Sequence, residues 1–283
     1  MVRAEADVQH LEPLRDGTYR VTYLEPGRRR GEVDGDVVCI AGGALATPTI
    51  LLRSAESLSG LSEQVGRNLS NNGDVGSFFE MPPDYPSVDC YKGRENTGIM
   101  LYEFWDEHRI TFHPGLHPLA LFGALEVHPP DIRPFGLEHK RWVEEVFPGR
   151  IIAGLCMGLA EGEGRVVLTD DGLPEIQFSL TDRLREHIST CESAMAAVVE
   201  PAGGRLLHTA REGYEYGDAH SMGTCRIAET TELGVCDRNG EVFGHERLFV
   251  VDSAALPGPL GVNPALTIGA NAERIADFVV ANR

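Results

Sequence analysis

The chain has 283 residues, and at roughly 150 residues per domain this length predicts one large or two medium-sized domains. Hydrophobic residues make up 42% and charged residues 24%, a globular composition that excludes collagen-like, coiled-coil and disordered classes. The net charge of −18, with no dense basic patch, argues against nucleic acid as a partner because a polyanion would be repelled.

The first forty residues alternate short apolar runs with turn signals. Apolar runs at 8–11 and 19–24 are separated by Asp16-Gly17, and Pro26-Gly27 precedes a third run at 36–40. This pattern predicts a β-meander that ends in a buried strand. The densest basic run of the chain, residues 28–30, is expected at the rim of a hairpin.

A turn of small residues at 41–46 follows and leads into Thr47-Pro48 and the apolar run 50–52. Threonine is a common N-cap and proline fits the first helical position, so a helix is predicted to begin here. A strand, a tight turn and a helix in this order allow a phosphate or an adenosine group to approach the backbone closely.

The middle of the chain differs in composition, since residues 76–180 are rich in proline and aromatic residues. Short apolar runs predict mostly antiparallel strands with long connections; the runs are at 109–112, 151–159, 165–168 and 176–180. Residues 181–200 carry apolar side chains at spacings of three and four, which predicts an amphipathic helix. A strand at 248–251 and a final helix from Pro264 complete the chain.

Common catalytic signatures are missing from the sequence. It contains no His-Glu-x-x-His, no Gly-x-Ser-x-Gly, no Walker loop and no Gly-x-Gly-x-x-Gly. His220, Cys225 and Cys236 lack both a fourth ligand and a standard zinc spacing, so no metal site is predicted. Taken singly, His220 has an ordinary structural explanation, and so do Asp252 as a loop cap and Asn263 as a helix cap before Pro264.

Taken together, the C-terminal motifs resemble the C-terminal half of the glucose–methanol–choline (GMC) oxidoreductases, flavoenzymes that oxidise alcohols. The matching pattern is His-x-x-Gly-Thr-Cys at 220–225, a strand ending in Val-x-Asp-Ser at 250–253, and Asn-Pro at 263–264. Residues 37–48 resemble the family's second signature, with departures at Ala46, Ala55, Glu56 and Ser57. Residues 66–74 and the Asn-Pro pair resemble the bacterial, cholesterol-oxidase-like branch.

The resemblance implies FAD as cofactor and oxidation of a CH–OH group. It implies that His220 is the base that removes the hydroxyl proton while hydride passes to flavin N5, and that Asn263 orients the alkoxide oxygen near the flavin edge. A histidine suits the first role because its ordinary pKa lies near neutral pH. The remaining cofactor-binding residues that it implies are Val8 and Gly43 at the adenosine half, Asp252 and Ser253 at the ribityl–pyrophosphate region, and Pro264 and Ala265 at the helix start that faces the ring.

The fold class that follows is α+β or α/β. We expect a partial FAD-binding, Rossmann-like domain that lacks its N-terminal βαβ unit and carries an inserted antiparallel-sheet substrate domain. Residues 1–75 are expected to form the C-terminal part of the FAD-binding domain, 76–200 the substrate-binding domain, and 201–283 the return to the FAD-binding domain with the catalytic segment.

Three hypotheses remain, because the family's Gly-x-Gly-x-x-Gly turn for the flavin pyrophosphate is missing from these residues. In the first, the chain is the catalytic-residue half of the enzyme, and the nucleotide-binding half is missing or is a separate polypeptide. In the second, it is a non-catalytic remnant, or a subunit of a split enzyme that does not bind FAD alone. In the third, it is an unrelated α/β binding protein with coincidental motifs.

Substrate and compartment are less sharply defined by the sequence. Aromatic residues of the insertion favour an apolar or sterol-like alcohol, and Glu103 or Glu126 is a candidate auxiliary carboxylate; the aromatic residues are Phe104, Trp105, Phe112, Phe122 and Phe135. Six scattered cysteines without Cys-x-x-Cys and the lack of a signal-peptide pattern predict a cytoplasmic protein. The longest uncharged apolar stretch, 151–160, is about half of a membrane span, so no span is predicted.

Overall fold

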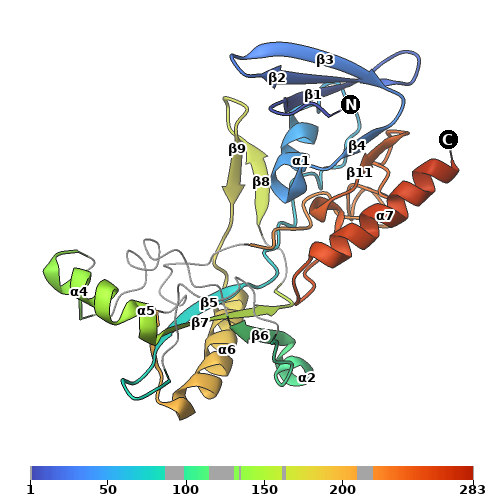
Figure 1. Cartoon of the computed structure of the whole chain (residues 1–283). Helices are drawn as coiled ribbons and strands as arrows, with labels where there is room; N and C mark the ends of the chain where they lie inside the picture. Colours follow the sequence, from blue (N-terminus) through green and yellow to red (C-terminus); the bar gives the residue numbers. More distant parts are fainter. Residues whose placement is uncertain are drawn as a thin grey trace. The chain divides into compact units, whose positions relative to one another are not determined.

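The computed structural model describes residues 2–86, 99–114, 131–133, 135–160, 164–208 and 219–282. It is a mixed α/β structure, as predicted (Figure 1). The chain divides into two compact units, and each combines segments that are distant in the sequence. Unit 1 comprises Met1–Asn72, Glu161–Ser179 and His220–Arg283, and unit 2 comprises Gly73–Ala160 and Leu180–Ala219.

The described residues of unit 1 form three small sheets and the two helices α1 and α7. Strands β1, β2 and β3 form an antiparallel meander, β4 pairs in parallel with β11, and β8 pairs with β9 as a hairpin. The elements are β1 (Asp7–Pro13), β2 (Tyr19–Glu25), β3 (Arg29–Gly35), β4 (Val38–Ile40), α1 (Gly43–Arg53), β8 (Arg165–Leu168), β9 (Pro174–Gln177), β11 (Leu248–Val250), the 3-10 helix η3 (Ser253–Ala255) and α7 (Ala265–Ala281).

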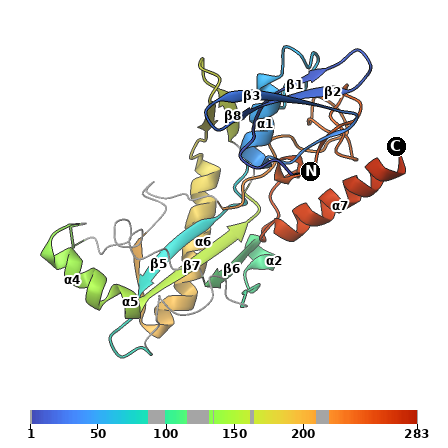
Figure 2. The same cartoon turned by 45° about the horizontal axis from the view of Figure 1, so that its top comes forward.

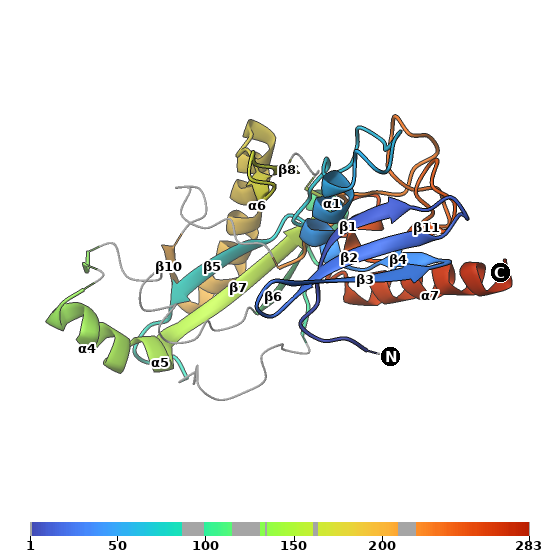
Figure 3. The same ribbon diagram turned by 90° about the horizontal axis from the view of Figure 1, so that it is seen from above.

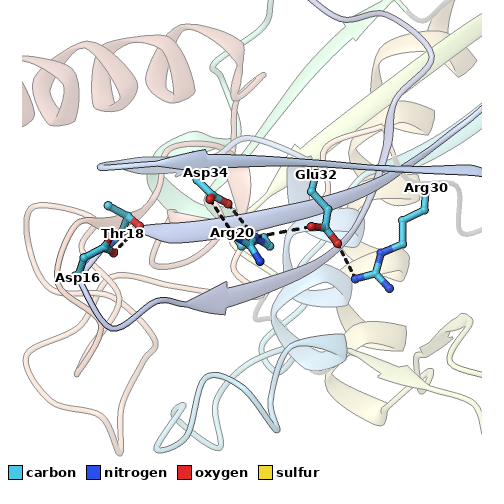
Figure 4. Close-up of polar contacts among 6 residues, drawn as sticks. All are labelled: Asp16, Thr18, Arg20, Arg30, Glu32 and Asp34. Carbon is cyan, nitrogen blue, oxygen red and sulfur yellow. Dashed lines mark hydrogen bonds and ion pairs between the residues drawn. The ribbon is translucent and has the colours of Figure 1, made fainter.

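The meander differs from the prediction in its third strand. We expected the apolar run 36–40 to close it, but β3 does so, and β4 leaves to pair with β11. The sequence of β3 lacks apolar alternation because most of its side chains are exposed. Its backbone pairs with β2 along the whole strand, and charge pairs lie on its exposed face (Figure 4). Arg20 of β2 binds Asp34 through two hydrogen bonds of 2.8 and 2.9 Å, and Glu32 lies 2.9 Å from Arg30.

The main core of unit 1 lies between β1, α1, β4 and β11. Figure 3 shows α1 beside β1, and α7 along the β4–β11 pair. Its buried members come from these elements, from the segment after α1 and from η3; they include Leu11, Ile40, Leu51, Leu58, Leu248, Val250 and Ala254. The C-terminal ends of β4 and β11 are therefore fixed side by side, and the chain leaves them at Ala41 and Val251.

Helix α1 begins five residues before the predicted position. It starts at Gly43, so Thr47 and Pro48 lie inside the helix rather than at its N-cap and first position. The side chain that binds its N-terminus is that of Asp252, whose carboxylate accepts the Gly43 N–H at 2.8 Å. A partner supplied from 209 positions away cannot be found in the local sequence pattern.

Unit 2 is built around a four-stranded antiparallel sheet with the order β10-β5-β7-β6. Helix α6 packs on β5 and β7 (Figure 2). The buried side chains follow the predicted apolar spacing except for Val198, which is exposed, and the Thr181 hydroxyl caps the helix. The elements are β5 (Val75–Glu80), α2 (Trp105–His108), β6 (Ile110–Pro114), α4 (Leu137–Glu145), α5 (Phe147–Arg150), β7 (Ile151–Gly158), α6 (Asp182–Val199), the 3-10 helix η1 (Glu200–Ala202) and β10 (Arg205–His208).

One part of the predicted insertion packs elsewhere. Residues 165–177 form the β8–β9 hairpin, which contacts α1 and belongs to unit 1. The reason is local, because the Leu69–Gly164 bridge ties the start of the hairpin to the segment after α1. Among the described helices, none is both long enough and apolar enough to cross a membrane.

Candidate functional site

The structure brings two predicted site residues into contact in unit 1. The Nδ2 amide of Asn263 donates to Nε2 of His220 at 3.1 Å, although 43 positions separate the two residues. An amide nitrogen is only a donor, so with the amide assigned this way Nε2 accepts and the neutral imidazole carries its proton on Nδ1. His220 is half-buried and Asn263 is exposed. A basic ring nitrogen therefore lies beside an amide donor, a pair that can bind one hydroxyl group.

Backbone hydrogen bonds hold the segment that carries His220. On one side, Met222 and Ser70 exchange two bonds of 2.9 and 3.0 Å. On the other side, the Gly223 N–H donates to the carbonyl of Ser253 at 3.1 Å. Gly223 has a φ of +93°, and a Cβ there would lie 2.6 Å from a carbonyl oxygen of the segment that holds Ser70. Glycine is therefore required for the close approach that places His220.

Asn263 stands directly before helix α7. Pro264 is buried as the N-cap, no side chain caps the helix, and its first turn holds no acidic residue. Ala265 and the two residues after it are exposed. The unpaired N–H groups of the first turn give this end of the helix a partial positive charge beside Asn263.

Asp252 lies at the end of β11 and is buried, with 7% of its surface exposed. Its Oδ2 accepts from the Gly43 N–H at 2.8 Å and from the Thr47 hydroxyl at 2.5 Å. Its Oδ1 accepts from the Ala254 N–H at 2.8 Å, which caps η3. The structure thus unites the predicted residues Asp252 and Gly43, and it shows the carboxylate engaged by protein donors.

The other predicted cofactor residues are placed differently. Ser253 begins η3 and is buried, whereas Ala265 is exposed at the start of α7. Val8 lies on β1 opposite Tyr23 and packs against the main core of unit 1. This packing is enough to explain the apolar residue at position 8, and no ligand contact is needed to account for it.

The residues at the start of α7 fit the ring edge of FAD, the cofactor that the resemblance implies. The exposed first turn offers N–H donors and partial positive charge, and the Asn263 amide lies at the same helix end. At the start of α1, the open space beside Gly43 would allow a ligand to approach the backbone closely. A Cβ on Gly43 would meet no atom within 4 Å. The Gly43 N–H itself is already donated to Asp252.

The aromatic and acidic candidates for substrate contact belong to unit 2. Phe112 is buried in the sheet, Phe104 and Trp105 are half-buried, and Phe135 and Glu103 are exposed. Phe122 and Glu126 lie outside the described residues. Phe112 is therefore part of the core rather than of an open surface.

The cysteines near the site are buried thiols. Burial raises the pKa of both Cys225 and Cys236, which keeps these thiols protonated. Within the ranges that the structure describes, no three His, Cys, Asp or Glu side chains gather as a ligand group.

Sequence reasoning missed two residues that build this site. Thr224 donates its hydroxyl to the carbonyl of Ala44 at 2.7 Å, and Asn72 is fully buried with its side chain bonded to the loop before Asn263. Both lie within motifs that carried the resemblance, but their partners are 180 or more positions away. No pattern in neighbouring residues reports such contacts.

Comparison with known proteins supports the resemblance. A family model for GMC oxidoreductases matches residues 160–272. A long-chain-alcohol oxidase of Arabidopsis thaliana is 27% identical over 272 residues, which cover 84% of this chain and 35% of that protein. A cholesterol oxidase of Acinetobacter baumannii is 49% identical over 63 residues, or 22% of this chain and 11% of that protein.

Solved structures show the same fold. The structure of a formate oxidase variant from Aspergillus oryzae aligns with 99% of this chain and 60% of its own, with a TM-score of 0.68 and 15% identity. The chain thus aligns over nearly its whole length with the formate oxidase structure, and it spans less than two thirds of the length of each of the three proteins.

Proposed function

We propose, from the GMC oxidoreductase C-terminal domain that residues 160–272 carry, that this chain is the catalytic-residue half of an FAD-dependent oxidoreductase that oxidises alcohols. The observation that carries the proposal is the 3.1 Å contact between His220 Nε2 and Asn263 Nδ2. Members of the family bind FAD, and alcohols are named as substrates of the plant relative.

In this proposal His220 and Asn263 divide the handling of one hydroxyl group. The hydroxyl displaces their mutual hydrogen bond, so that its oxygen accepts from Asn263 Nδ2 and its proton points to His220 Nε2. His220 takes that proton as the C–H bond breaks, and Asn263 holds the oxygen as its negative charge grows. FAD, when bound, supplies the two-electron acceptor for the reaction. The N–H groups at the start of α7 stabilise negative charge at the same helix end.

The pyrophosphate of FAD needs donors from another segment. The 283 residues include no Gly-x-Gly-x-x-Gly turn, and the Gly43 N–H is engaged by Asp252. We infer that a nucleotide-binding half, on a separate polypeptide or on further chain, completes the cofactor site. The same two observations favour the alternative, a non-catalytic remnant or split-enzyme subunit that does not bind FAD alone.

For the substrate we propose an apolar alcohol of the long-chain or sterol type. Long-chain alcohols are named for the plant relative, and the stretch with the highest of the reported identities is shared with a cholesterol oxidase. The second likeness also supports the cholesterol-oxidase-like branch, as does the Asn263-Pro264 pair.

The experiment is an FAD titration followed by turnover assays with a long-chain alcohol and with cholesterol. The chain is tested alone and together with a nucleotide-binding half from a GMC relative. We expect a bound-flavin spectrum for the pair and flavin reduction by alcohol under anaerobic conditions. In His220→Ala we expect reduction to slow by about 100-fold or more, because the base is lost, with the flavin spectrum retained.

The matched control is His108→Ala, a histidine exposed at the end of α2. It is expected to leave reduction unchanged. Lack of flavin binding in both preparations would favour the non-catalytic alternative, and normal reduction by His220→Ala would show that another group is the base.

A further inference from the structure

We propose that Asn72 is the positioning residue that sets the geometry of the His220–Asn263 pair. Its side chain is fully buried, and its Oδ1 accepts from the N–H groups of Leu260 and Gly261, each at 2.8 Å. Its Nδ2 donates to the carbonyl of Val262 at 2.8 Å. One amide therefore holds the three residues that directly precede Asn263.

The same short segment also holds the segment that carries His220. Ser70 pairs with Met222, two residues after His220, through the two backbone bonds of the bridge. The Ser70 hydroxyl accepts the N–H of Asn72 at 3.2 Å, which ties the two contacts together. Residues 70–72 thus link one member of the pair through the backbone and the other through a side chain.

Asparagine is the residue type that this position requires. Its φ is +61°, a left-handed conformation that asparagine adopts more readily than other non-glycine residues. It supplies both an acceptor for two N–H groups and a donor for a carbonyl. Aspartate has no donor, leucine has neither group, and glycine has no side chain.

The effect of Asn72 on the rate of the reaction rests on the proposed function. A hydroxyl group that bridges His220 and Asn263 needs both nitrogens at fixed separation, and small displacements in a reacting constellation cost rate steeply. Asn263 is exposed and has no strand or helix before it, so its position depends on the 260–262 loop. Asn72 holds that loop, although Asn72 need not contact substrate.

The test compares Asn72→Leu and Asn72→Asp with the same two changes at Asn68. Asn68 is a matched control because its φ is also left-handed, at +63°, and its side chain donates to Gln64 of the same segment. The backbone cost of replacing asparagine is thus shared by both positions. The difference between the two sets reports the side-chain contacts.

The first measurement is hydrogen exchange of the Leu260 and Gly261 amides in the intact chain. We expect exchange to speed up about tenfold or more in Asn72→Leu, since the acceptor is lost, and to stay slow in Asn72→Asp and in both Asn68 variants. The second is the ¹⁵N resonance of His220 Nε2, which reports the bond from Asn263. We expect it to shift in both Asn72 variants and in neither Asn68 variant.

An unchanged Nε2 resonance in folded Asn72→Leu overturns the proposal. If Asn72→Leu does not fold, Asn72→Asp decides, because it keeps the two N–H contacts and loses only the hold on Val262. An unchanged resonance there overturns the proposal as well. Neither measurement needs FAD or turnover, so both remain valid if the proposed oxidation fails.

The activity readout is made with the FAD-loaded pair of halves. We expect Asn72→Leu to lower kcat at least about tenfold with KM within about twofold and the flavin spectrum unchanged, because the transition state needs the geometry more than the bound state does. If the wild-type protein turns over alcohol and Asn72→Leu has the same kcat, the positioning role of Asn72 is contradicted. The proposed function is then left intact.

Discussion

Asp252 connects three parts of unit 1 through one buried carboxylate. It follows β11, and it accepts hydrogen bonds from Gly43 and Thr47 of α1 and from Ala254 of η3. The family resemblance implies that Asp252 lies beside the cofactor, and this cofactor-binding role stays a prediction. The contacts give it a structural role as well, because its charge lies at the N-terminus of α1, where the helix dipole favours an anion.

The Asp252→Asn variant tests this structural role. We expect its free energy of unfolding to fall by about 1–3 kcal/mol, because the new amide NH₂ must face a backbone N–H or the Thr47 hydroxyl and leave a buried donor unpaired. Urea denaturation measures the change. Asp34→Asn is the control, since it alters the same group on the exposed face of β3 and is expected to cost less. An equal loss in both variants would refute the role of Asp252.

At the scale of elements, α1 tolerates a proline in its interior because a distant side chain replaces the missing bond. Pro48 has no N–H for the carbonyl four residues earlier, which is that of Ala44. The Thr224 hydroxyl donates to this carbonyl at 2.7 Å. The segment of His220 is thereby attached to α1, and local rules for helix starts fail here because the repair comes from tertiary contact.

A double-mutant cycle tests this repair. Thr224→Val should lower the free energy of unfolding by about 1–3 kcal/mol, because it leaves the buried Ala44 carbonyl without a donor. In the Pro48→Ala background the loss should be smaller by at least about 0.5 kcal/mol, since the substituted alanine would supply the backbone N–H that proline lacks.

Thr49→Val serves as the control for the cycle. The Thr49 hydroxyl donates to the carbonyl of Leu45, which is also the regular helical partner of the Thr49 N–H. Its removal is expected to cost less than Thr224→Val. Strictly additive losses for Thr224→Val and Pro48→Ala would show that the hydroxyl does not substitute for the missing bond.

At the scale of the whole molecule, each unit contains a histidine whose pKa is lowered by partial or full burial. Burial lowers the pKa of His187 in unit 2, although its hydrogen bond to the Gly73 carbonyl at 2.8 Å opposes the shift. Burial also lowers the pKa of His245 in unit 1. The unfolded chain binds these protons more readily than the folded chain, so stability is full above the ordinary pKa of about 6.5 and falls as pH drops below it.

Acidification should therefore destabilise both units. We expect the free energy of unfolding to decrease between pH 8 and pH 5.5 by at most about 1.4 kcal/mol per pH unit for each histidine. In the variant with His187→Gln and His245→Gln the decrease should be smaller, and urea denaturation at the two pH values measures it. The difference in the free energy of unfolding between the variant and the wild type at pH 8 measures the effect of the substitutions on packing. An unchanged pH dependence in the variant would assign the acid sensitivity to other groups.

Much of the secondary structure could be predicted because it depends on neighbouring residues. The spacing of apolar residues predicted α6, and the turn signals predicted β1 and β2. The strand β3 could not be predicted in this way, because its side chains are mostly exposed and it is joined to β2 by backbone pairing rather than by an apolar face. The predicted start of α1 was wrong for a related reason, since the N-terminus of the helix is bound by Asp252, which is 209 positions from Gly43.

The sequence by itself determined which residue types are present at the site. His220, Asp252 and Asn263 were found from motifs whose members lie within a few positions of one another. Only the tertiary structure decided that His220 and Asn263 touch, that Asn72 holds the loop before Asn263, and that Thr224 completes α1. The physical reason is that periodicity and capping report contacts within about one helical turn, whereas these hydrogen bonds close loops of 43 to 190 positions.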